Sequence, residues 1–309
     1  MMAERLSAVR MLLCACGAAA AISSPQCALA ADAPRAKVKY AARTPAPAKR
    51  DSAAAEPTPS LKSAAVLVVD LDNGSTVYAK NTQSITPIAS ITKLMTAMVV
   101  LDAGLPLQEM VYVDHADYDS VKHTNSRLRA GTGLTRHDML RLALMSSENR
   151  AAAALGRDYP GGSRAFVDAM NRKAAELGMW NTRFVDPTGL SSENVSTAED
   201  LVRMVKAAYE YPLIREFTTT AAHEVATANG RPLQFSNSNR LVKNPTWDIG
   251  LSKTGYISEA GRCLVMQARI AARSVVIVLL DSWGKYTRIG DANRIKKWLE
   301  STLARKPLG

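Results

Sequence analysis

Two kinds of hydrophobic pattern alternate with polar connections along the chain. Short runs rich in β-branched and other apolar residues predict strands at 64–70, 75–79, 247–251, 262–270 and 274–280. Apolar residues three and four positions apart predict helices at 91–101, 138–155, 163–177, 197–209 and 291–303. Because strands lie near both ends and helices lie between them, we expect an α/β or α+β domain. Its antiparallel sheet would combine N-terminal and C-terminal strands.

The connections between these elements carry turn and cap signals. Asp72-Asn73-Gly74 joins the first two strands and is a strong hairpin signal. The helix from 91 is expected to stop near Gly104 and Pro106. Ser196-Thr197-Ala198-Glu199 has the spacing of a capping box and marks the start of the 197–209 helix. Asp186-Pro187-Thr188-Gly189-Leu190 is typical of a turn-rich loop.

The N-terminal residues predict export. Arg5 and Arg10 precede an apolar segment at 11–22, and Ala28-Leu29-Ala30 provides a small-residue cleavage site. We therefore expect residues 1–30 to be a signal peptide that is cleaved near Ala30. Residues 31–60 contain Ala, Pro, Lys and Arg with almost no large apolar side chains, which indicates a flexible, basic tether. The folded domain is expected to cover residues 61–305.

Composition limits the possible partners. The 309 residues are 47% hydrophobic and 22% charged, which is ordinary for a soluble globular protein, but the net charge of +11 is not. Such a charge fits nucleic acid, an anionic membrane surface or an anionic polymer such as a cell wall. Nucleic-acid binding would need aromatic residues among the basic ones, whereas only 6% of residues are aromatic. After the signal, no apolar run of about eighteen residues predicts a transmembrane segment.

Cysteine and histidine offer little further chemistry. Cys263 is the one cysteine beyond the expected signal peptide, so no intramolecular disulfide or zinc-site spacing is available, and we expect it to be a buried small hydrophobe. The chain lacks the Gly-x-Ser-x-Gly elbow of many Ser-His-Asp hydrolases. His223-Glu224 is not followed by a second histidine at metal-binding spacing, which argues against a zinc peptidase. We expect no metal and no cofactor.

Ser90-Ile91-Thr92-Lys93 at the opening of an apolar helix is the central chemical signal. Residues three apart share a helix face, so the Lys93 amine can reach the Ser90 hydroxyl. Serine needs a base to act as a nucleophile, and lysine is a base only when burial or a second cation lowers its pKa. The pattern alone is weak, because Ser282-Trp283-Gly284-Lys285 repeats it at the end of a predicted strand.

Two further motifs follow Ser90-x-x-Lys93 in the chain. Ser147-x-Asn149 interrupts the helical pattern of 138–155, and Lys253-Thr254-Gly255 extends the strand predicted from Trp247. Polar residues that break an apolar helical pattern usually have a functional or connecting reason. Ser192-Glu193-Asn194 copies the second motif but lies in a loop without a helical flank.

The order of the three motifs resembles that of the penicillin-recognising serine DD-peptidases and β-lactamases. Longer segments at 144–152, 159–162, 186–190 and 251–255 resemble the low-molecular-mass penicillin-binding proteins, the serine D-alanyl-D-alanine peptidases of family S11. The similarity is greatest to the endopeptidase branch and spans roughly residues 62–300. It implies a β-lactamase/DD-peptidase-like fold, with an antiparallel sheet flanked by helices and an all-helical subdomain.

The resemblance implies three catalytic residues. Ser90 would attack the carbonyl of a D-alanine residue and form an acyl-enzyme. Lys93 would take the proton of Ser90, with a buried helix behind it and the charge of Lys253 keeping it neutral. Ser147 would relay the proton to the leaving amine.

The same resemblance implies a set of substrate-binding residues. Asn149 would hydrogen-bond the substrate backbone or orient Lys93, and Lys253 would attract a substrate carboxylate. Thr254 would offer that carboxylate a hydroxyl, and Gly255 would let a strand edge approach the peptide. The backbone N–H groups of Ser90 and Tyr256 would form the oxyanion hole.

Several functions share these motifs. A β-lactamase of one class needs a dedicated glutamate for deacylation, and no convincing one occurs between 158 and 194. A non-catalytic, basic wall-binding protein would be expected to lose Ser90 or Lys93. A carboxypeptidase shares all the chemistry but releases free D-alanine, and many such relatives carry an added β-rich domain and a membrane-binding helix. We therefore expect a periplasmic endopeptidase that cleaves peptidoglycan cross-links and binds β-lactam antibiotics covalently, with the carboxypeptidase as the alternative.

Overall fold

The computed structural model describes residues 58–226 and 232–304. The expected signal peptide (1–30) and all but the last three residues of the expected tether (31–60) lie outside the described residues. Within the described part of the chain, no helix combines the length and the apolar character that crossing a membrane requires.

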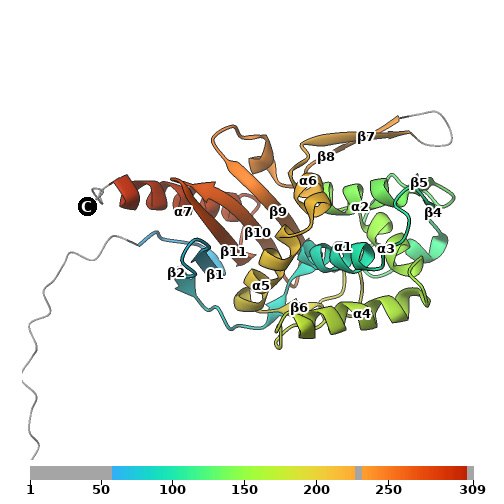
Figure 1. Cartoon of the computed structure of the whole chain (residues 1–309), viewed down its shortest axis with the longest axis horizontal. Helices are drawn as coiled ribbons and strands as arrows, with labels where there is room; N and C mark the ends of the chain where they lie inside the picture. Colours follow the sequence, from blue (N-terminus) through green and yellow to red (C-terminus); the bar gives the residue numbers. More distant parts are fainter. Residues whose placement is uncertain (1–57, 227–231, 305–309) are drawn as a thin grey trace, which may run out of the picture. The chain divides into compact units, whose positions relative to one another are not determined.

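A five-stranded antiparallel sheet runs through the domain (Figure 1). It consists of β1 (Ser63–Asp70), β2 (Thr76–Lys80), β9 (Asp248–Ile257), β10 (Gly261–Ile270) and β11 (Arg273–Ser282), in the order β2-β1-β11-β10-β9. The N-terminal strand β1 pairs with the C-terminal strand β11, with Val66 opposite Leu279. This pairing confirms the predicted sheet. β9 is an edge strand, so one side of its backbone is free of sheet pairing.

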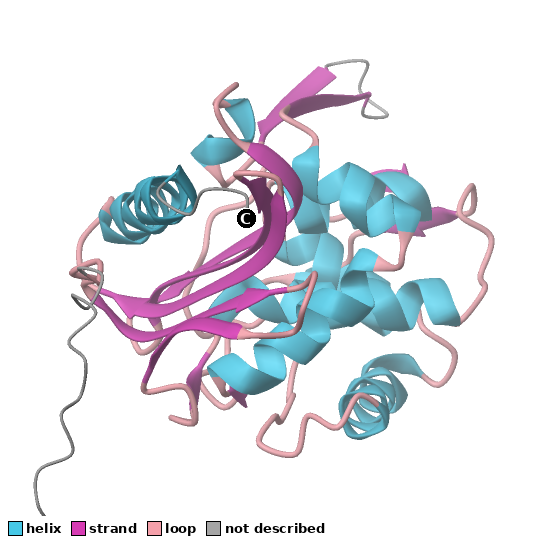
Figure 2. Cartoon of the chain, turned by 60° about the vertical axis from the view of Figure 1, so that its left-hand side comes forward, coloured by secondary structure: helices cyan, strands magenta, loops and turns pink. Residues whose placement is uncertain are grey.

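Helices cover both faces of the sheet (Figure 2). Successive strand residues point to opposite faces, so Cys263 and Val265 join one core cluster while Leu264 and Met266 join another. The helix α7 (Thr287–Ala304) packs on the second cluster. The first cluster lies between the sheet and the remaining helices.

Six helices form that other layer and the all-helical subdomain. They are α1 (Lys93–Asp102), α2 (Arg136–Met145), α3 (Asn149–Arg157), α4 (Gly162–Glu176), α5 (Ala198–Tyr209) and α6 (Pro212–Thr219). α1 is buried at every residue from 93 to 100, because α2 to α6 all contact it. A helix that is packed on all sides provides water-free surroundings for a polar group at its end. The predicted fold class is confirmed.

Short ribbons and 3-10 turns complete the described structure. The ribbons pair β3 (Thr86–Pro87) with β6 (Val195–Ser196), β4 (Met110–Tyr112) with β5 (Gly133–Thr135), and β7 (Ala222–Ala226) with β8 (Pro232–Ser236). The 3-10 turns are η1 (Ala89–Thr92), η2 (His115–Asp117) and η3 (Arg240–Lys243). The sequence pattern did not predict α6 or the β7–β8 ribbon. Both are short, and each ribbon strand buries a single residue.

Three local predictions are wrong in detail. Ser90 lies in η1 and not on an α-helix, and α7 begins at Thr287 instead of 291. The cap of α5 is Thr197, whose hydroxyl accepts from the N–H of Asp200. The expected cap, Ser196, belongs to β6, and its Oγ lies 2.8 Å from Thr182 Oγ1.

Asp291 of α7 anchors the start of β1. Its buried carboxylate accepts hydrogen bonds from the Ser63 N–H at 2.7 Å, the Ser63 hydroxyl at 2.5 Å and the Lys62 N–H, and it pairs with Arg294. Burial alone would raise the pKa of Asp291, but the bonds from Ser63, Arg294 and Lys62 hold that pKa below its usual value. Asp291 is therefore ionised in the folded protein at neutral pH.

Asp291→Asn is expected to lower the free energy of unfolding by about 2 kcal/mol or more, because its amide would point N–H groups at the donors of residues 62 and 63. The difference in stability between the variant and the unchanged protein has its full size above a pH of about 4, the pKa of an unfolded Asp. It becomes smaller as the pH falls through the lower pKa of Asp291 in the folded state, because the unchanged protein then loses the same interactions. Urea unfolding at several pH values measures it. Asp248→Asn, at an exposed position of β9, is the control and should change stability by less than about 0.5 kcal/mol. An equal loss of stability in both variants would show that Asp291 does not anchor the start of β1.

Candidate active site

Ser90 and Lys93 lie on adjoining turns at the start of the buried helix. Ser90 is in η1, and Lys93 is the first residue of α1. Side chains three residues apart eclipse one another in a 3-10 turn, so Lys93 Nζ lies 2.9 Å from Ser90 Oγ. Ala89, just before the serine, has φ of 47°, in the left-handed region that non-glycine residues rarely adopt. The turn that presents Ser90 is thus strained.

Burial changes the chemistry of the Lys93 amine. The side chain is 0% exposed, and burial lowers its pKa to about 7, although the charges of Asp186 and Glu148 act in the opposite direction. The sequence predicted two causes, burial and the charge of Lys253. Burial is the one that acts, since the pKa of Lys253 is itself lowered well below its usual value. A large fraction of Lys93 is therefore neutral at physiological pH.

Three oxygen atoms surround Lys93 Nζ. They are Ser90 Oγ at 2.9 Å, Asn149 Oδ1 at 2.7 Å and the Thr188 carbonyl oxygen at 2.6 Å. A neutral amine has two N–H groups and one lone pair. The oxygens of Asn149 and Thr188 can only accept, so they take the two N–H groups. The lone pair of Lys93 is left facing the Ser90 hydroxyl, which is the geometry a general base needs.

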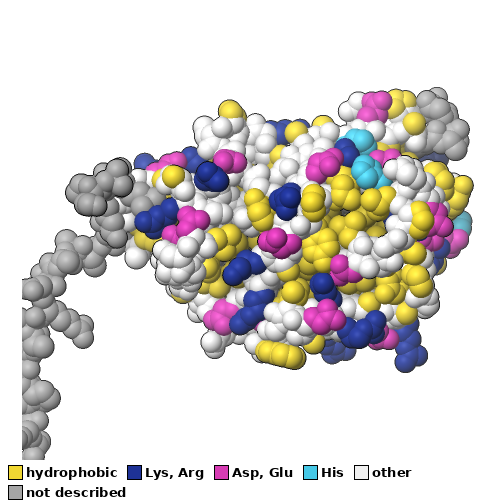
Figure 3. Space-filling model, viewed as in Figure 1, with side chains coloured by type: hydrophobic (Ala, Val, Ile, Leu, Met, Phe, Trp, Pro, Cys, Tyr) yellow, Lys and Arg dark blue, Asp and Glu magenta, His cyan; other side chains and the backbone are white. Residues whose placement is uncertain are grey.

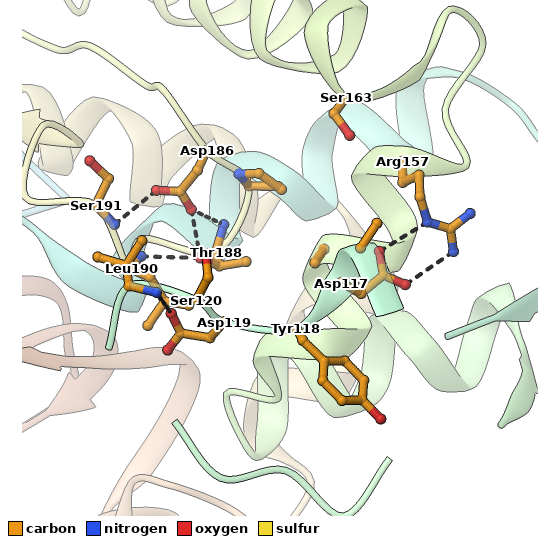
Figure 4. A pocket seen from close by; sticks show the side chains of 14 residues that line it. Asp117, Tyr118, Asp119, Ser120, Arg157, Ser163, Asp186, Thr188, Leu190 and Ser191 are labelled. Carbon is orange, nitrogen blue, oxygen red and sulfur yellow. Dashed lines mark hydrogen bonds and ion pairs between the residues drawn. The ribbon is translucent and has the colours of Figure 1, made fainter. Parts of the chain in front are cut away.

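The loop from Asp186 to Ser191 holds the Thr188 carbonyl against Lys93. The Asp186 carboxylate accepts from the backbone N–H groups of Thr188 at 2.6 Å, Gly189 at 2.7 Å and Ser191 at 3.0 Å. Figure 4 shows this carboxylate turned toward Thr188 and Ser191 on the wall of a neighbouring cavity. Gly189 has φ of 80°, and a Cβ there would collide with the Ala89 carbonyl oxygen. Only glycine lets the loop close on η1.

A hydrogen-bonded chain orients Asn149, the first residue of α3. Its Nδ2 donates to Thr124 Oγ1 at 3.0 Å, and Thr124 Oγ1 donates to Asp119 Oδ2 at 2.8 Å. Burial would raise the pKa of Asp119, but backbone hydrogen bonds from Lys122 and Thr124 hold that pKa below its usual value. The ionised carboxylate takes the Thr124 hydrogen, so the Thr124 oxygen accepts from Nδ2. Asn149 Oδ1 must then face Lys93.

Ser147 lies in the break between α2 and α3, where the helical pattern of the sequence is interrupted. Its φ is 63°, again left-handed for a non-glycine residue. Lys253 Nζ, from β9, donates to Ser147 Oγ at 2.9 Å and to the Thr254 carbonyl at 3.0 Å. Burial, followed by the charges of Lys93 and Arg288, lowers the pKa of Lys253. Because Ser147 Oγ accepts from Lys253, its own proton is free to be donated into the cleft.

Thr254, Gly255 and Tyr256 continue along the edge strand β9. A Cβ at Gly255 would lie 2.8 Å from the Ile88 carbonyl oxygen and 3.2 Å from the Ser90 nitrogen. The close packing of β9 on η1 therefore requires glycine, in addition to the open strand edge expected from the sequence. Tyr256 is 55% exposed, whereas Thr254 is buried.

These elements enclose a cavity of about 210 Å³. It is lined by Ser90, Thr124, Ser147, Asn149, Leu190, Thr254, Gly255, Tyr256 and Arg288. All the site residues predicted from the sequence line it except Lys93 and Lys253. The two lysines lie buried behind the cavity, each bonded to one of its serines.

Arg288 was not predicted from the sequence. Its Nη1 donates to the Gly255 carbonyl at 2.7 Å and to the Cys263 carbonyl at 3.2 Å, while its Nε is buried without a partner among the described residues. Burial and the neighbouring Arg262 lower its pKa to about 10, so the guanidinium stays charged at neutral pH. A single arginine at the start of a helix has no motif that marks it as functional.

The described residues offer little for metal or thiol chemistry. Within 58–226 and 232–304, no three His, Cys, Asp or Glu residues are grouped so as to hold a metal ion. Cys263 is free, and burial raises its pKa to about 11. It is the buried small hydrophobe that the sequence predicted.

The fold and this cavity define the class, a penicillin-recognising serine peptidase with the β-lactamase-like architecture. The family model described as Peptidase S11, D-alanyl-D-alanine carboxypeptidase, matches residues 51–283. The chain belongs to this family of serine peptidases, and the predicted family is confirmed.

Named relatives cover most of the chain. It is 51% identical over 242 residues to a D-alanyl-D-alanine endopeptidase of Pseudomonas aeruginosa, covering 78% of each protein. It is 48% identical over 255 residues to the enzyme of that name from Escherichia coli, covering 82% of each. A solved D-alanyl-D-alanine carboxypeptidase from Mycobacterium tuberculosis superposes with a TM-score of 0.73 at 29% identity, covering 83% of this chain and 96% of the other.

Acylation of Ser90 by a penicillin is expected to depend on an amine with a pKa of about 7. Lys93 must be neutral to accept the proton, so the acylation rate rises about tenfold per pH unit below that pKa and levels off above it. Stopped-flow acylation from about pH 5 to about 9 measures the profile. A rate that does not change between about pH 6 and 8 would exclude Lys93 as the base.

Thr124→Val is expected to slow this acylation about tenfold, because Asn149 loses the acceptor that keeps its Oδ1 toward Lys93. The pH midpoint of acylation should also move, which a purely structural defect would not cause. Thr76→Val, at an exposed position of β2, is the matched control and should acylate as the unchanged protein does. Identical pH profiles for Thr124→Val and the unchanged protein would show that the chain through Asp119 does not orient Asn149.

Proposed function

We propose that the chain is a periplasmic D-alanyl-D-alanine endopeptidase that hydrolyses D-alanine–diamino acid cross-links of peptidoglycan through an acyl-enzyme. The observation that carries the proposal is the buried amine of Lys93, which lies 2.9 Å from Ser90 Oγ and has acceptors for two N–H groups in Asn149 and Thr188. The names of the Pseudomonas and Escherichia relatives support the choice of bond. Export to the periplasm rests on the signal-peptide pattern of residues 1–30.

Acylation begins when Ser90 Oγ attacks the D-alanine carbonyl while Lys93 takes the hydroxyl proton. The developing oxyanion is stabilised by the backbone N–H groups of Ser90 and Tyr256, at the meeting point of η1 and β9. Gly255 permits this close approach of the two segments. The C–N bond then breaks and the leaving amine needs a proton.

Ser147 relays that proton: it gives its own hydrogen to the leaving amine and takes in exchange the proton that Lys93 removed from Ser90, so that Lys93 is neutral again and Ser147 keeps its hydroxyl. Its hydroxyl accepts from Lys253 Nζ at 2.9 Å, so its hydrogen points away from Lys253 and toward the cleft. Water later attacks the acyl-enzyme with Lys93 again as the base, and Ser90 regains its proton. Thr254 and the charged Arg288 lie where a substrate carboxylate would be held.

A carboxypeptidase is the second candidate, since the family description and the Mycobacterium structure both carry that activity in their names. It uses the same acyl-enzyme and differs in the group that leaves. A non-catalytic basic wall-binding protein has less support. Figure 3 shows Lys and Arg interspersed with Asp and Glu on the face in view, without one continuous basic patch, and the Ser90–Lys93 pair is intact.

The deciding experiment gives the purified protein cross-linked dimeric muropeptides and, separately, pentapeptide monomers, and follows the products by mass. The expected result is conversion of dimers to monomers without free D-alanine, and its complete loss in Ser90→Ala, because the nucleophile is gone. Release of D-alanine from monomers alone would make the protein a carboxypeptidase. A product that persists in Ser90→Ala, or no product at all, would remove the enzymatic proposal.

A further inference from the structure

A second groove of about 480 Å³ adjoins the active-site cavity. It is lined by residues of three segments, 125–127, 146–148 and 235–236. Two of these segments also supply the catalytic cavity, because Thr124 precedes the first and Ser147 lies within the second. The groove therefore lies beside Ser147.

The groove carries one charge of each sign. Arg127 comes from the loop that also holds Thr124, and Glu148 caps α3 by accepting from the Arg150 N–H at 3.3 Å. No ion pair joins Arg127 to a carboxylate within residues 58–226 and 232–304. Both charged groups thus keep hydrogen-bonding capacity for a ligand.

The guanidinium of Arg127 is held in place, although it is exposed. It lies 4.0 Å from the ring centroid of Phe235 and donates a hydrogen bond from Nη1 to the Gln234 carbonyl. Both partners belong to β8. Stacking on Phe235 and the hydrogen bond to Gln234 hold the planar guanidinium in one orientation. Less side-chain entropy is therefore lost when its other N–H groups bind a ligand. A freely moving surface arginine would not offer this.

Position and charge together indicate what the groove takes. If Ser147 protonates the leaving amine, the peptide that leaves must pass Ser147 and enter the adjoining space. Free D-alanine has no atoms to reach beyond its own carboxylate, but a cross-linked stem does. Such a stem carries carboxylates that suit a guanidinium and amide N–H groups that suit Glu148.

We propose that this groove is the leaving-side subsite for the second peptide stem, and that Arg127 binds a carboxylate of that stem. The proposal rests on the proposed function and deepens it, because it names the residue that favours cross-links over monomers. The hydroxyls of Ser126, Ser146 and Ser236 line the same groove and add hydrogen-bonding groups for a peptide.

The test compares Arg127→Ala, Arg127→Lys and the unchanged protein on three reactions, with enzyme concentrations set by titration with a labelled penicillin. The reactions are cleavage of dimeric muropeptides, release of D-alanine from pentapeptide monomers, and acylation by the penicillin. For dimers, kcat/KM of Arg127→Ala is expected to fall about three- to tenfold, mainly through KM. Arg127→Lys should retain part of the activity, because lysine keeps the positive charge but lacks the planar guanidinium that can bind a carboxylate through two N–H groups. The two reactions that leave the groove empty should change by less than about twofold.

The matched control is Arg129→Ala, which removes the same charge from the same exposed loop at a position outside the groove. It should leave dimer cleavage within about twofold of the unchanged protein. A second probe is a dimer whose stem carboxylates are amidated. The unchanged protein and Arg127→Ala should cleave this dimer at the same rate, because no carboxylate is left for Arg127 to bind. A loss that both proteins share would come from Thr254 and Arg288 instead.

Three results would contradict the proposal that this groove is the leaving-side subsite. They are equal dimer cleavage by Arg127→Ala and the unchanged protein, equal losses in all three reactions, or an equal loss in Arg129→Ala. Failure of the proposed function has a different signature, namely that the unchanged protein acylates with penicillin but cleaves no dimers in a Ser90-dependent way. That result would remove both proposals.

Discussion

The burial of one amine next to one hydroxyl is the constraint on which the rest of the structure depends. A charged lysine is costly to bury, and the cost is relieved when the group is neutral at physiological pH. Lys93 meets this condition at the end of α1, a helix with no solvent-facing side over residues 93 to 100. The packing of α2 to α6 around α1 thus also creates the surroundings that the base proposed for Ser90 requires.

A neutral amine can act as a base for a serine only if its lone pair faces the hydroxyl. For Lys93, the groups that set this orientation come from segments far apart in the chain. Asn149 and Thr188 lie 56 and 95 residues from Lys93 and accept its two N–H groups. Each acceptor is fixed by a carboxylate, Asn149 through Thr124 and Asp119, and Thr188 through Asp186. Asp119 and Asp186 hydrogen-bond to hydroxyl and backbone N–H groups and not to the amine of Lys93. Their main effect is therefore to fix the positions of its two acceptors.

The sequence predicted the sheet, most helices and the serine, lysine and glycine motifs, since these depend on short spacings and on period. It could not predict Asp119, Thr124 or Arg288, because each is a common residue type whose partner is distant in the chain. The role of Thr188 is carried by a carbonyl oxygen, which every residue possesses. Thr197 caps α5 in place of the predicted Ser196, because Ser196 belongs to β6 and its hydroxyl contacts that of Thr182. This is a tertiary interaction, which a local sequence motif cannot predict.

The same limit applies to the choice between carboxypeptidase and endopeptidase. In the proposed mechanism Ser90, Lys93 and Ser147 act on the carbonyl and on the amine nitrogen. Both reactions share these groups, so no property of the motifs can separate the two activities. Discrimination has to come from groups that meet the leaving peptide beyond its first residue. The loop 124–127 is bound at Thr124 to the amide of Asn149 and at Arg127 to β8, so a single segment bears on both the base and the groove. The loop that orients the base therefore also borders the groove proposed for the leaving stem.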